Sequence, residues 1–313
     1  MHLIVLVAIF AVAWGLRSTW TETVQSTWSE RWERTLSIFL LPPLLLFTSS
    51  ISIILMGPHG RMVWVGNDWL SYGLALGFLV FTGLYLLKLT NTGWQILQKV
   101  RTYPITQLGG SRVRIMNLSI PYIAQIGFWQ PELVVARGLL DTLKTEHLVA
   151  VLAHEQAHYR YRDTWYFFWL GWIRQITNWL PQTEAMWQEL LVLRELRADL
   201  WASRQTDPLL VAEALLLVVQ NTSVFTENFC TAFSQVAPAN RLTQRIDALI
   251  EIAELTILHG SGLSANNLNI DAPVGMHQLR VFATRWQRQR HHLYSWAWLL
   301  IGLLPLLAIF FHA

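Results

Sequence analysis

The sequence has 313 residues, of which 53% are hydrophobic and only 14% are charged, with a formal net charge of +3. This composition, with a mean hydropathy of +0.34, excludes an ordinary soluble protein and predicts a mainly α-helical membrane protein with several segments in lipid. The single cysteine, Cys230, excludes a disulfide framework and a cysteine-based zinc site, and we interpret it as a buried structural thiol.

Four apolar segments are predicted to cross the bilayer as helices. They are residues 2–16, 36–56, 69–89 and 293–311. The first is short for a full span and could instead be a signal peptide, but no Lys or Arg precedes its apolar run, which disfavours that alternative. Pro42 and Pro43 predict a kink near one end of the second span.

The positions of the basic residues predict the orientation. Three Arg lie in the loop of residues 17–35 and one in the loop of residues 57–68, whereas Lys and Arg gather after the third span and again at 280–290. Because Lys and Arg collect on the cytoplasmic side, both termini are predicted outside and the region 90–290 in the cytoplasm. The Arg residues of 280–290 would then lie against anionic lipid head groups, so no direct nucleic-acid binding is expected.

A cytoplasmic domain is therefore inserted between the third and fourth spans. Residues 1–89 are predicted to form a membrane region with three transmembrane helices, and residues 291–313 a C-terminal transmembrane helix. The α+β domain of residues 90–290 lies between them, in a multi-pass protein of the plasma or inner membrane.

The first part of this domain predicts a helix followed by a small sheet. A helix is expected near 92–101, and Gly109-Gly110 is typical of a hairpin turn. Short strands are predicted at 112–118, 123–127 and 133–136. The free edge of a strand so close to the next helix could hold an extended peptide by backbone pairing, although an ordinary strand of a small sheet fits the same residues.

The next helix carries the pattern H-E-x-x-H. Thr145 can cap its N-terminus, and an apolar face follows. His154 and His158 are four residues apart, so their rings lie on one helix face, and Glu155 sits beside that face. In this pattern two neutral imidazoles hold zinc, and the carboxylate takes a proton from the water that zinc activates. For the motif alone, a chance match on a solvated helix is the alternative.

A second motif, E-x-x-x-D, supplies the rest of a zinc site. Zinc needs a third protein ligand and one open position. Glu195 and Asp199, in the stretch RELRAD, are spaced to share one helix face. Glu195 can reach the metal, and Asp199 can accept the spare ring N–H of a ligand His and fix its tautomer. RELRAD alone is more typical of a solvated charged face, so its interpretation depends on the H-E-x-x-H helix.

Further helices complete the domain. Residues 165–180 are strongly aromatic but interrupted by polar residues, which predicts a helix lying in or on the membrane surface above the active site, with a fifth span as the alternative. Pro181 is expected to start the long helix of the acidic motif. Helices are also predicted at 208–220 and 240–255, and a loop at 259–275.

The domain resembles the BlaR/MecR-type membrane metallopeptidases in the stretches AQIGFWQPELVVARGLL, AVLAHEQAHYRYRD and RELRAD. These antirepressor proteases are related more distantly to the HtpX and prenyl-protein proteases. The resemblance covers about residues 70–255 and is strongest from Gln125 to Asp199. It implies a gluzincin-type zinc domain between the third and fourth spans, with Glu155 as general base and Asp199 as the partner of a ligand His. It also implies one Zn2+ ion, whose ligands would be His154, His158 and Glu195.

The resemblance implies a protease that responds to an outside signal by cleaving a cytoplasmic winged-helix repressor of the BlaI/MecI type, or itself. Antibiotic-sensing members carry an extracellular penicillin-binding domain, whereas this sequence contains no S-x-x-K sensor motif. The expected signal is therefore a metal such as copper, a membrane state or a partner protein rather than a β-lactam. At Gln156 the family usually has an aliphatic residue, a difference that a helix tolerates.

The sequence thus predicts a signal-responsive, membrane-embedded zinc endopeptidase whose site opens to the cytoplasm. Zinc would polarise the scissile carbonyl, and Glu155 would carry a proton from water to the leaving amine. Three residues are near enough in sequence to stabilise the oxyanion, with no basis for choosing among them: Tyr159, Arg194 and Arg197. Two other functions stay open. One is a quality-control protease of the HtpX type, and the other is a non-catalytic membrane receptor that keeps zinc for structure, which a closed site with four protein ligands would favour.

Overall fold

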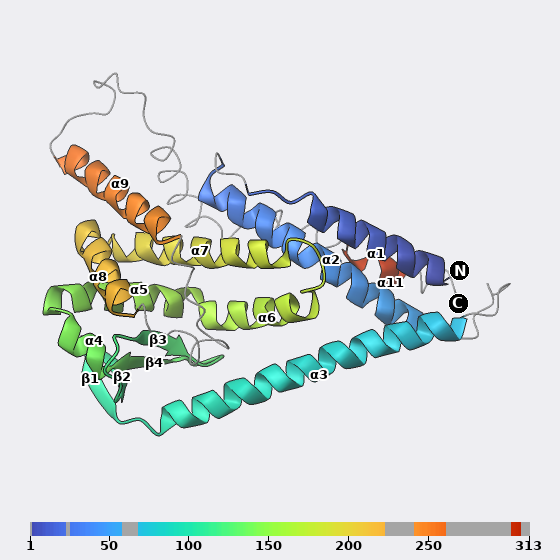
Figure 1. Ribbon diagram of the computed structural model, residues 1–313, viewed down its shortest axis with the longest axis horizontal. Coiled ribbons are helices and arrows are strands. Elements are labelled where there is room, and N and C mark those ends of the chain that lie inside the picture. Colours follow the sequence, from blue (N-terminus) through green and yellow to red (C-terminus); the bar gives the residue numbers. More distant parts are fainter. Residues whose placement is uncertain (1, 23–25, 58–67, 223–240, 261–301, 308–313) are drawn as a thin grey trace, which may run out of the picture. The chain divides into compact units, whose positions relative to one another are not determined.

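The chain divides into two compact units, called here the helical unit and the mixed unit. The helical unit comprises Met1–Lys88, Gly171–Leu190 and Val281–Ala313, and the mixed unit comprises Leu89–Leu170 and Leu191–Arg280. The computed structural model describes residues 2–22, 26–57, 68–222, 241–260 and 302–307. Figure 1 labels their helices and strands.

Outside its Gly171–Leu190 segment, the described part of the helical unit consists mainly of apolar helices. They are α1 (His2–Ser18), α2 (Trp28–Met56), the first part of α3 (Asp68–Arg101) and the short α11 (Leu304–Leu307). α2 begins at a capping box in which the side chains of Thr27 and Glu30 each accept the other's backbone N–H. It runs through Pro42 and Pro43 and ends at Gly57, whose φ of 73° favours glycine.

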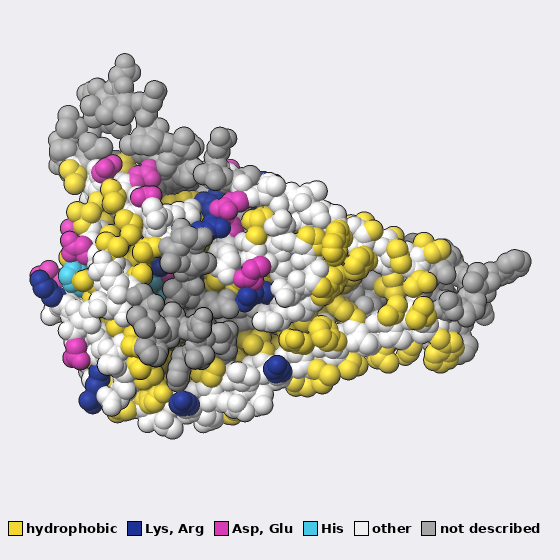
Figure 2. All heavy atoms as spheres, in the orientation of Figure 1, with side chains coloured by type: hydrophobic (Ala, Val, Ile, Leu, Met, Phe, Trp, Pro, Cys, Tyr) yellow, Lys and Arg dark blue, Asp and Glu magenta, His cyan; other side chains and the backbone are white. Residues whose placement is uncertain are grey.

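Two helices are long and apolar enough to cross a membrane, and they contain the predicted spans 36–56 and 69–89. These helices are Trp28–Met56 and Trp69–Arg101. Only 17% of the most apolar stretch of α3 is buried, and apolar side chains gather on the surface shown in Figure 2. The exposed large apolar side chains of α3 are Trp69, Leu70, Leu74, Leu76, Val80, Phe81, Leu84, Leu87 and Trp94. So long an exposed apolar face suits lipid and not water, which supports a membrane location.

The other predicted spans are not confirmed. α1, over the predicted span 2–16, has 17 residues, fewer than the roughly 20 that a full span needs. Most of 293–311 lies outside the described residues, although the carbonyl of Gly302 accepts a hydrogen bond of 2.7 Å from Thr48 of α2. Three other predictions also lie wholly or mostly outside the described residues: Cys230, the loop at 259–275 and the basic segment 280–290.

The helix predicted near 92–101 is not a separate element. α3 continues from the predicted span 69–89 to Arg101 without a break. The polar residues after Leu89 contain no proline, so the backbone keeps its helical hydrogen bonds beyond the apolar stretch.

A four-stranded sheet follows α3. Its strands are β1 (Ile105–Leu108), β2 (Ser111–Met116), β3 (Ile123–Ile126) and β4 (Glu132–Ala136), in the order β1-β2-β4-β3. β2 and β4 are parallel, and the other neighbours are antiparallel. The predicted strands at 112–118, 123–127 and 133–136 are thus confirmed. So is the hairpin turn at Gly109-Gly110, where φ is 55° and 79°.

The described chain then continues as helices. They are α4 (Arg137–Thr142), α5 (Thr145–Tyr161), α6 (Asp163–Ile176), α7 (Thr183–Ala202), α8 (Pro208–Thr222) and α9 (Leu242–Gly260). Two predicted boundaries are wrong. Thr145 is not the cap of α5, because Lys144 holds the N-cap position without a side-chain hydrogen bond. Pro181 does not start α7, because Gln182 adopts a left-handed φ of 56° and the helix begins at Thr183.

Both faces of the sheet are covered within the mixed unit. Leu133 and Val135 of β4 pack on one face, together with Leu152 of α5. Val134 packs on the opposite face with Val100, from the last turns of α3. β4 is therefore apolar at successive positions rather than alternating, as expected of a strand buried on both sides. This sheet and α5 form the frame on which the candidate site is built.

Candidate metal centre

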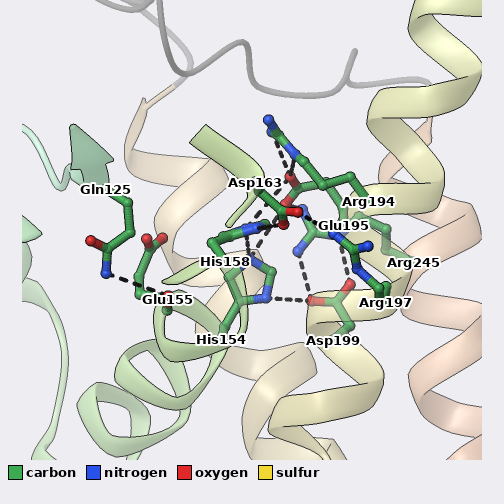
Figure 3. Close-up of polar contacts among 10 residues, drawn as sticks. All are labelled: Gln125, His154, Glu155, His158, Asp163, Arg194, Glu195, Arg197, Asp199 and Arg245. Carbon is green, nitrogen blue, oxygen red and sulfur yellow. Dashed lines mark hydrogen bonds and ion pairs between the residues drawn. The ribbon is translucent and has the colours of Figure 1, made fainter. Parts of the chain in front are cut away.

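Two histidines of α5 direct their Nε2 atoms toward the same point. His154 and His158 lie one helical turn apart, and their Nε2 atoms are 3.1 Å from each other. The rings meet edge to face, with centroids 4.8 Å apart (Figure 3). Two imidazole nitrogens so close together provide half of a metal site.

α7 brings a carboxylate to the same point. Oε2 of Glu195 lies 3.3 Å from Nε2 of His154, and Oε1 lies 3.7 Å from Nε2 of His158. One ligand atom from each of the three residues can be chosen so that all lie within 4.8 Å of one another. A tetrahedral zinc ion with bonds of about 2.0–2.2 Å holds its ligand atoms about 3.3–3.6 Å apart. The donor set therefore fits zinc in chemistry and in spacing.

Each histidine is oriented by a second carboxylate. Nδ1 of His154 lies 2.9 Å from Oδ1 of Asp199, which the sequence predicts. Nδ1 of His158 lies 2.7 Å from Oδ2 of Asp163, at the start of α6. A hydrogen bond from Nδ1–H fixes the tautomer in which Nε2 keeps its lone pair for a metal. Both rings are thus prepared as ligands by buried partners.

An arginine accompanies each of the three carboxylates that contact the histidines. The three pairs are Arg194–Glu195, Arg197–Asp163 and Arg245–Asp199. The strongest geometry is that of Arg245 in α9, whose Nε and Nη2 donate to the two oxygens of Asp199 at 2.7 and 2.8 Å. Since a buried carboxylate is stable only when its charge is compensated, these arginines keep the acidic groups ionised.

The pKa values follow from burial and from these charges. Burial raises the pKa of Glu195, but Arg194 and other nearby cations hold it well below its usual range. Burial likewise raises the pKa of Asp199, and Arg245 brings it below the ordinary value. Burial lowers the pKa of His154, yet hydrogen bonds with Asp199 and Glu195 raise it to about 10. Without metal, His154 therefore carries a proton at neutral pH that a metal must displace.

Glu155 is buried beside the edge of the sheet. Its backbone carbonyl accepts a hydrogen bond of 3.4 Å from Nε2 of Gln125 in β3. Figure 3 shows the Glu155 side chain between Gln125 and the two histidines in that view. Oε1 of Gln125 is buried and has no hydrogen-bond partner among the described residues. An acceptor is thus left open next to the acidic residue of the H-E-x-x-H motif.

β3 forms one edge of the sheet, and the described chain places no strand beyond it. The N–H of Ala136 donates to the carbonyl of Tyr122 at 2.8 Å, next to the β3–β4 ladder. Backbone groups of alternate residues face the partner strand in an antiparallel ladder. Tyr122 and Ala124 therefore face β4, whereas Ile123 and Gln125 direct their backbone groups toward the free edge.

Three residues were considered for stabilising the oxyanion, namely Tyr159, Arg194 and Arg197. Arg194 and Arg197 bind carboxylates of the site and also stack on Phe167 and Tyr161, at 4.7 and 4.2 Å from the ring centroids. Tyr159 is 57% exposed. The two arginines therefore hold the site together, which makes them poor candidates for binding substrate.

Three residues of the site were missed from the sequence: Gln125, Asp163 and Arg245. Asp163 carries a local signal, because it is an acidic residue five positions after His158 that opens an aromatic helix. Gln125 lies in a strand that was predicted beside the zinc helix. Nothing in the sequence singles out Arg245, which lies 46 positions after its partner Asp199.

A comparison with protein families matches residues 124–234 to the model of peptidase family M48. Members of this family are zinc metallopeptidases, so the match supports a metallopeptidase of this kind and does not extend to the BlaR/MecR type in particular. The matched region contains the H-E-x-x-H helix and the E-x-x-x-D motif. Comparisons with curated proteins and with solved structures found no match.

Proposed function

We propose that the chain is a membrane-embedded zinc endopeptidase whose site lies on α5 and α7. The observation that carries this proposal is the convergence of His154, His158 and Glu195, with Glu155 beside them in the H-E-x-x-H motif. The M48 match and the two candidate membrane helices support it. We further propose a multi-pass protein of the plasma or inner membrane, with the site facing the cytoplasm.

The residues divide the chemistry between binding and proton transfer. When bound, zinc supplies a Lewis acid that polarises the scissile carbonyl and acidifies water. His154, His158 and Glu195 hold the ion. Glu155 accepts the proton of the attacking water and later gives it to the leaving amine.

The free edge of β3 offers a binding site for the substrate backbone. Ile123 and Gln125 direct N–H and C=O groups toward this edge, and an extended peptide can pair with them as an added strand. The Gln125 side chain bonds the backbone of Glu155, so such a peptide would run beside the general base. Its open Oε1 could accept a substrate N–H.

A non-catalytic receptor with structural zinc is the less favoured function. A structural site is closed by four protein ligands. In the described residues only three His or acidic residues form the cluster, and Asp163 and Asp199 bind the Nδ1 atoms on the other side of the rings. Three protein ligands leave the fourth position of a tetrahedral ion to water or substrate, as catalysis requires.

Two substrate classes are consistent with the M48 match, which supports neither of them in particular. One is a cytoplasmic winged-helix repressor of the BlaI/MecI type, or the chain itself, cleaved in response to a signal. The other is the set of misfolded membrane proteins handled by a quality-control protease of the HtpX type. We place the repressor first because of the sequence resemblance.

The test compares the full chain with Glu155→Gln, each purified in detergent. Zinc per chain, self-cleavage, and cleavage of both a BlaI/MecI-type repressor and an unrelated unfolded membrane protein would be measured. Zinc in both proteins with cleavage only by the wild type is expected, because the amide that replaces the carboxylate cannot carry the proton. Glu146→Gln, an exposed position on the same helix, is the matched control and should cleave normally.

Full activity of Glu155→Gln would overturn the mechanism. Zinc in both proteins with no cleavage of any probe by the wild type would favour the receptor. Cleavage of the repressor alone supports the regulatory protease, whereas cleavage of the unrelated protein supports quality control.

A further inference from the structure

A segment of the helical unit, Gly171–Leu190, packs among helices that are predicted to lie in the membrane. It contains the end of α6, a turn at residues 177–182 and the start of α7. Nε1 of Trp172 donates to the carbonyl of Thr82 in α3 at 3.0 Å. The same indole lies 5.4 Å from the ring of Phe47 in α2. Both partners lie well inside the predicted spans 36–56 and 69–89.

The turn of this segment contacts α1. The ring of Trp179 stacks on Phe10, with centroids 5.4 Å apart and planes within 1°. Phe10 lies in the middle of the apolar stretch 2–16. At the start of α7, Oγ1 of Thr183 accepts a hydrogen bond of 3.0 Å from the buried Arg17. The segment therefore touches all three of the first predicted spans, and not only their cytoplasmic ends.

Several carbonyls at the turn are hydrogen-bonded within the segment, as lipid requires of a chain that is not helical. The carbonyl of Ile176, which ends α6, accepts a hydrogen bond of 2.8 Å from the Trp179 indole. The carbonyl of Thr177 accepts from the N–H of Leu180 at 2.9 Å and from the hydroxyl of Thr183 at 2.8 Å. The Thr183 hydroxyl also lies 2.9 Å from the carbonyl of Leu180. In water such carbonyls could bond solvent instead.

The charged groups of the segment are paired. Nε of Arg174 donates to Glu184 at 2.8 Å, and the same guanidinium lies over the ring of Trp187, 5.4 Å from its centroid. Further along α7, Glu189 binds Arg31 of α2 at 2.6 Å, and both side chains are buried. Ionisable groups within membranes are normally paired in this way.

The segment is too short to cross the bilayer. α6 has 14 residues, which extend about 21 Å along the axis, against a hydrocarbon core of about 30 Å. Its turn then leads into α7, which continues as one helix to the proposed ligand Glu195. The fifth span considered from the sequence is therefore disfavoured, and so is a helix that only lies on the surface.

We propose that Gly171–Leu190 is a re-entrant membrane hairpin whose turn is in contact with lipid. Trp179 is 42% exposed beside Phe10, so its free face would meet acyl chains. The inference rests on the proposed membrane location of α2 and α3 but not on peptidase activity. In this proposal the lipid bilayer is the partner of the aromatic segment, and the turn is the part of the segment that lies deepest in the bilayer.

The test measures the depth of single spin labels in the full chain reconstituted in liposomes. Cys230→Ser removes the one native cysteine. Single cysteines then replace Trp179 or its exposed neighbour Asn178. Leu84, exposed on α3, and Glu254, exposed on α9, are the reference positions. Asn178→Cys guards against a fold defect, because it leaves the Trp179–Phe10 contact intact.

Labels at 178 and 179 are expected to collide more with oxygen than with a water-soluble nickel chelate, as at 84, and the label at 254 to do the reverse. If the labels at 178 and 179 collided more with the nickel chelate, as the label at 254 does, while the label at 84 still collided more with oxygen, the hairpin alone would be overturned. An aqueous pattern at 84 would overturn the membrane location of α3 and the hairpin with it. Neither result depends on whether the protein cleaves peptides. A failure of the hairpin proposal is therefore distinguishable from a failure of the proposed peptidase activity.

Discussion

The guanidinium of Arg17 donates a hydrogen bond of 2.8 Å to the backbone carbonyl of Phe39. In a regular helix that carbonyl would accept the N–H of residue 43, but Pro43 has none. Arg17 of α1 thus supplies the donor that the proline removes from α2. The same side chain bonds Thr183, so one buried cation joins α1, α2 and α7 within the helical unit.

Replacing Arg17 by Met should therefore destabilise the protein in a way that depends on Pro43. The loss leaves the Phe39 carbonyl buried and unsatisfied, at a cost of about 1–3 kcal/mol. Pro43→Ala restores a backbone N–H for that carbonyl, so Arg17→Met should cost less in this background. Thermal unfolding of the four proteins in detergent measures the difference. Equal costs in both backgrounds would refute the link, and the exposed Arg34→Met should have little effect.

Asp163 should matter for zinc as much as Asp199 does. Removing a carboxylate that orients a ligand His typically lowers metal affinity by about 10–100-fold. Asp163→Ala frees the His158 ring and is expected to weaken zinc binding in this range, as measured by competition with a chelator. Asp141→Ala, an exposed position on α4, is the control. Wild-type affinity in a folded Asp163→Ala protein would show that Asp163 does not position the ring.

The proposed zinc ligands could be predicted because their signal is either local or chemical. His154 and His158 meet through the helical period alone. Glu195 comes from another helix, and it was predicted only because zinc requires a third protein ligand. Asp163 was missed because Arg162 bends the chain with a left-handed φ of 54°. An Arg in this conformation leaves no trace in the sequence, whereas a glycine would have suggested the turn.

The supporting charges and several boundaries depend on tertiary structure. Arg245 lies in an amphipathic helix where a charged residue is ordinarily expected to face solvent, yet it is buried against Asp199. Pro181 looked like a helix start, but the left-handed Gln182 follows it and delays α7. Three strands of the sheet were predictable because Gly109-Gly110 and the apolar strand residues give local signals, whereas no strand was predicted over β1.

Arg245→Met should make the metal-free protein sensitive to acid. The folded pKa of Asp199 lies below its ordinary value because Arg245 outweighs burial. A depressed pKa gives stability that is present above the unfolded pKa and is lost as the pH falls through the folded pKa. Without Arg245 the folded pKa rises, so this stability is lost at higher pH.

Circular dichroism during acid titration of the metal-free protein measures this shift. The midpoint should move to higher pH in Arg245→Met, and stability at neutral pH should fall by about 3–5 kcal/mol, as when one partner of a buried ion pair is removed. The exposed Arg204→Met is the matched control. Acid unfolding of Arg245→Met at the wild-type pH would show that Arg245 does not stabilise the ionised Asp199.

Zinc binding should release a proton from His154. The pKa of this ring is raised to about 10 without metal, so the ring is charged at pH 7, whereas a metal needs it neutral. Zinc affinity should therefore rise by about tenfold per pH unit below that value. The raised pKa of His154 also affects folding stability. The protonated ring stabilises the metal-free folded protein fully below the unfolded pKa of about 6.5, and this stabilisation is lost as the pH rises through the folded pKa of about 10. Calorimetry in buffers of different ionisation enthalpy counts the protons. Asp199→Asn removes one cause of the raised pKa and should release fewer protons, and an equal count in both proteins would contradict this assignment.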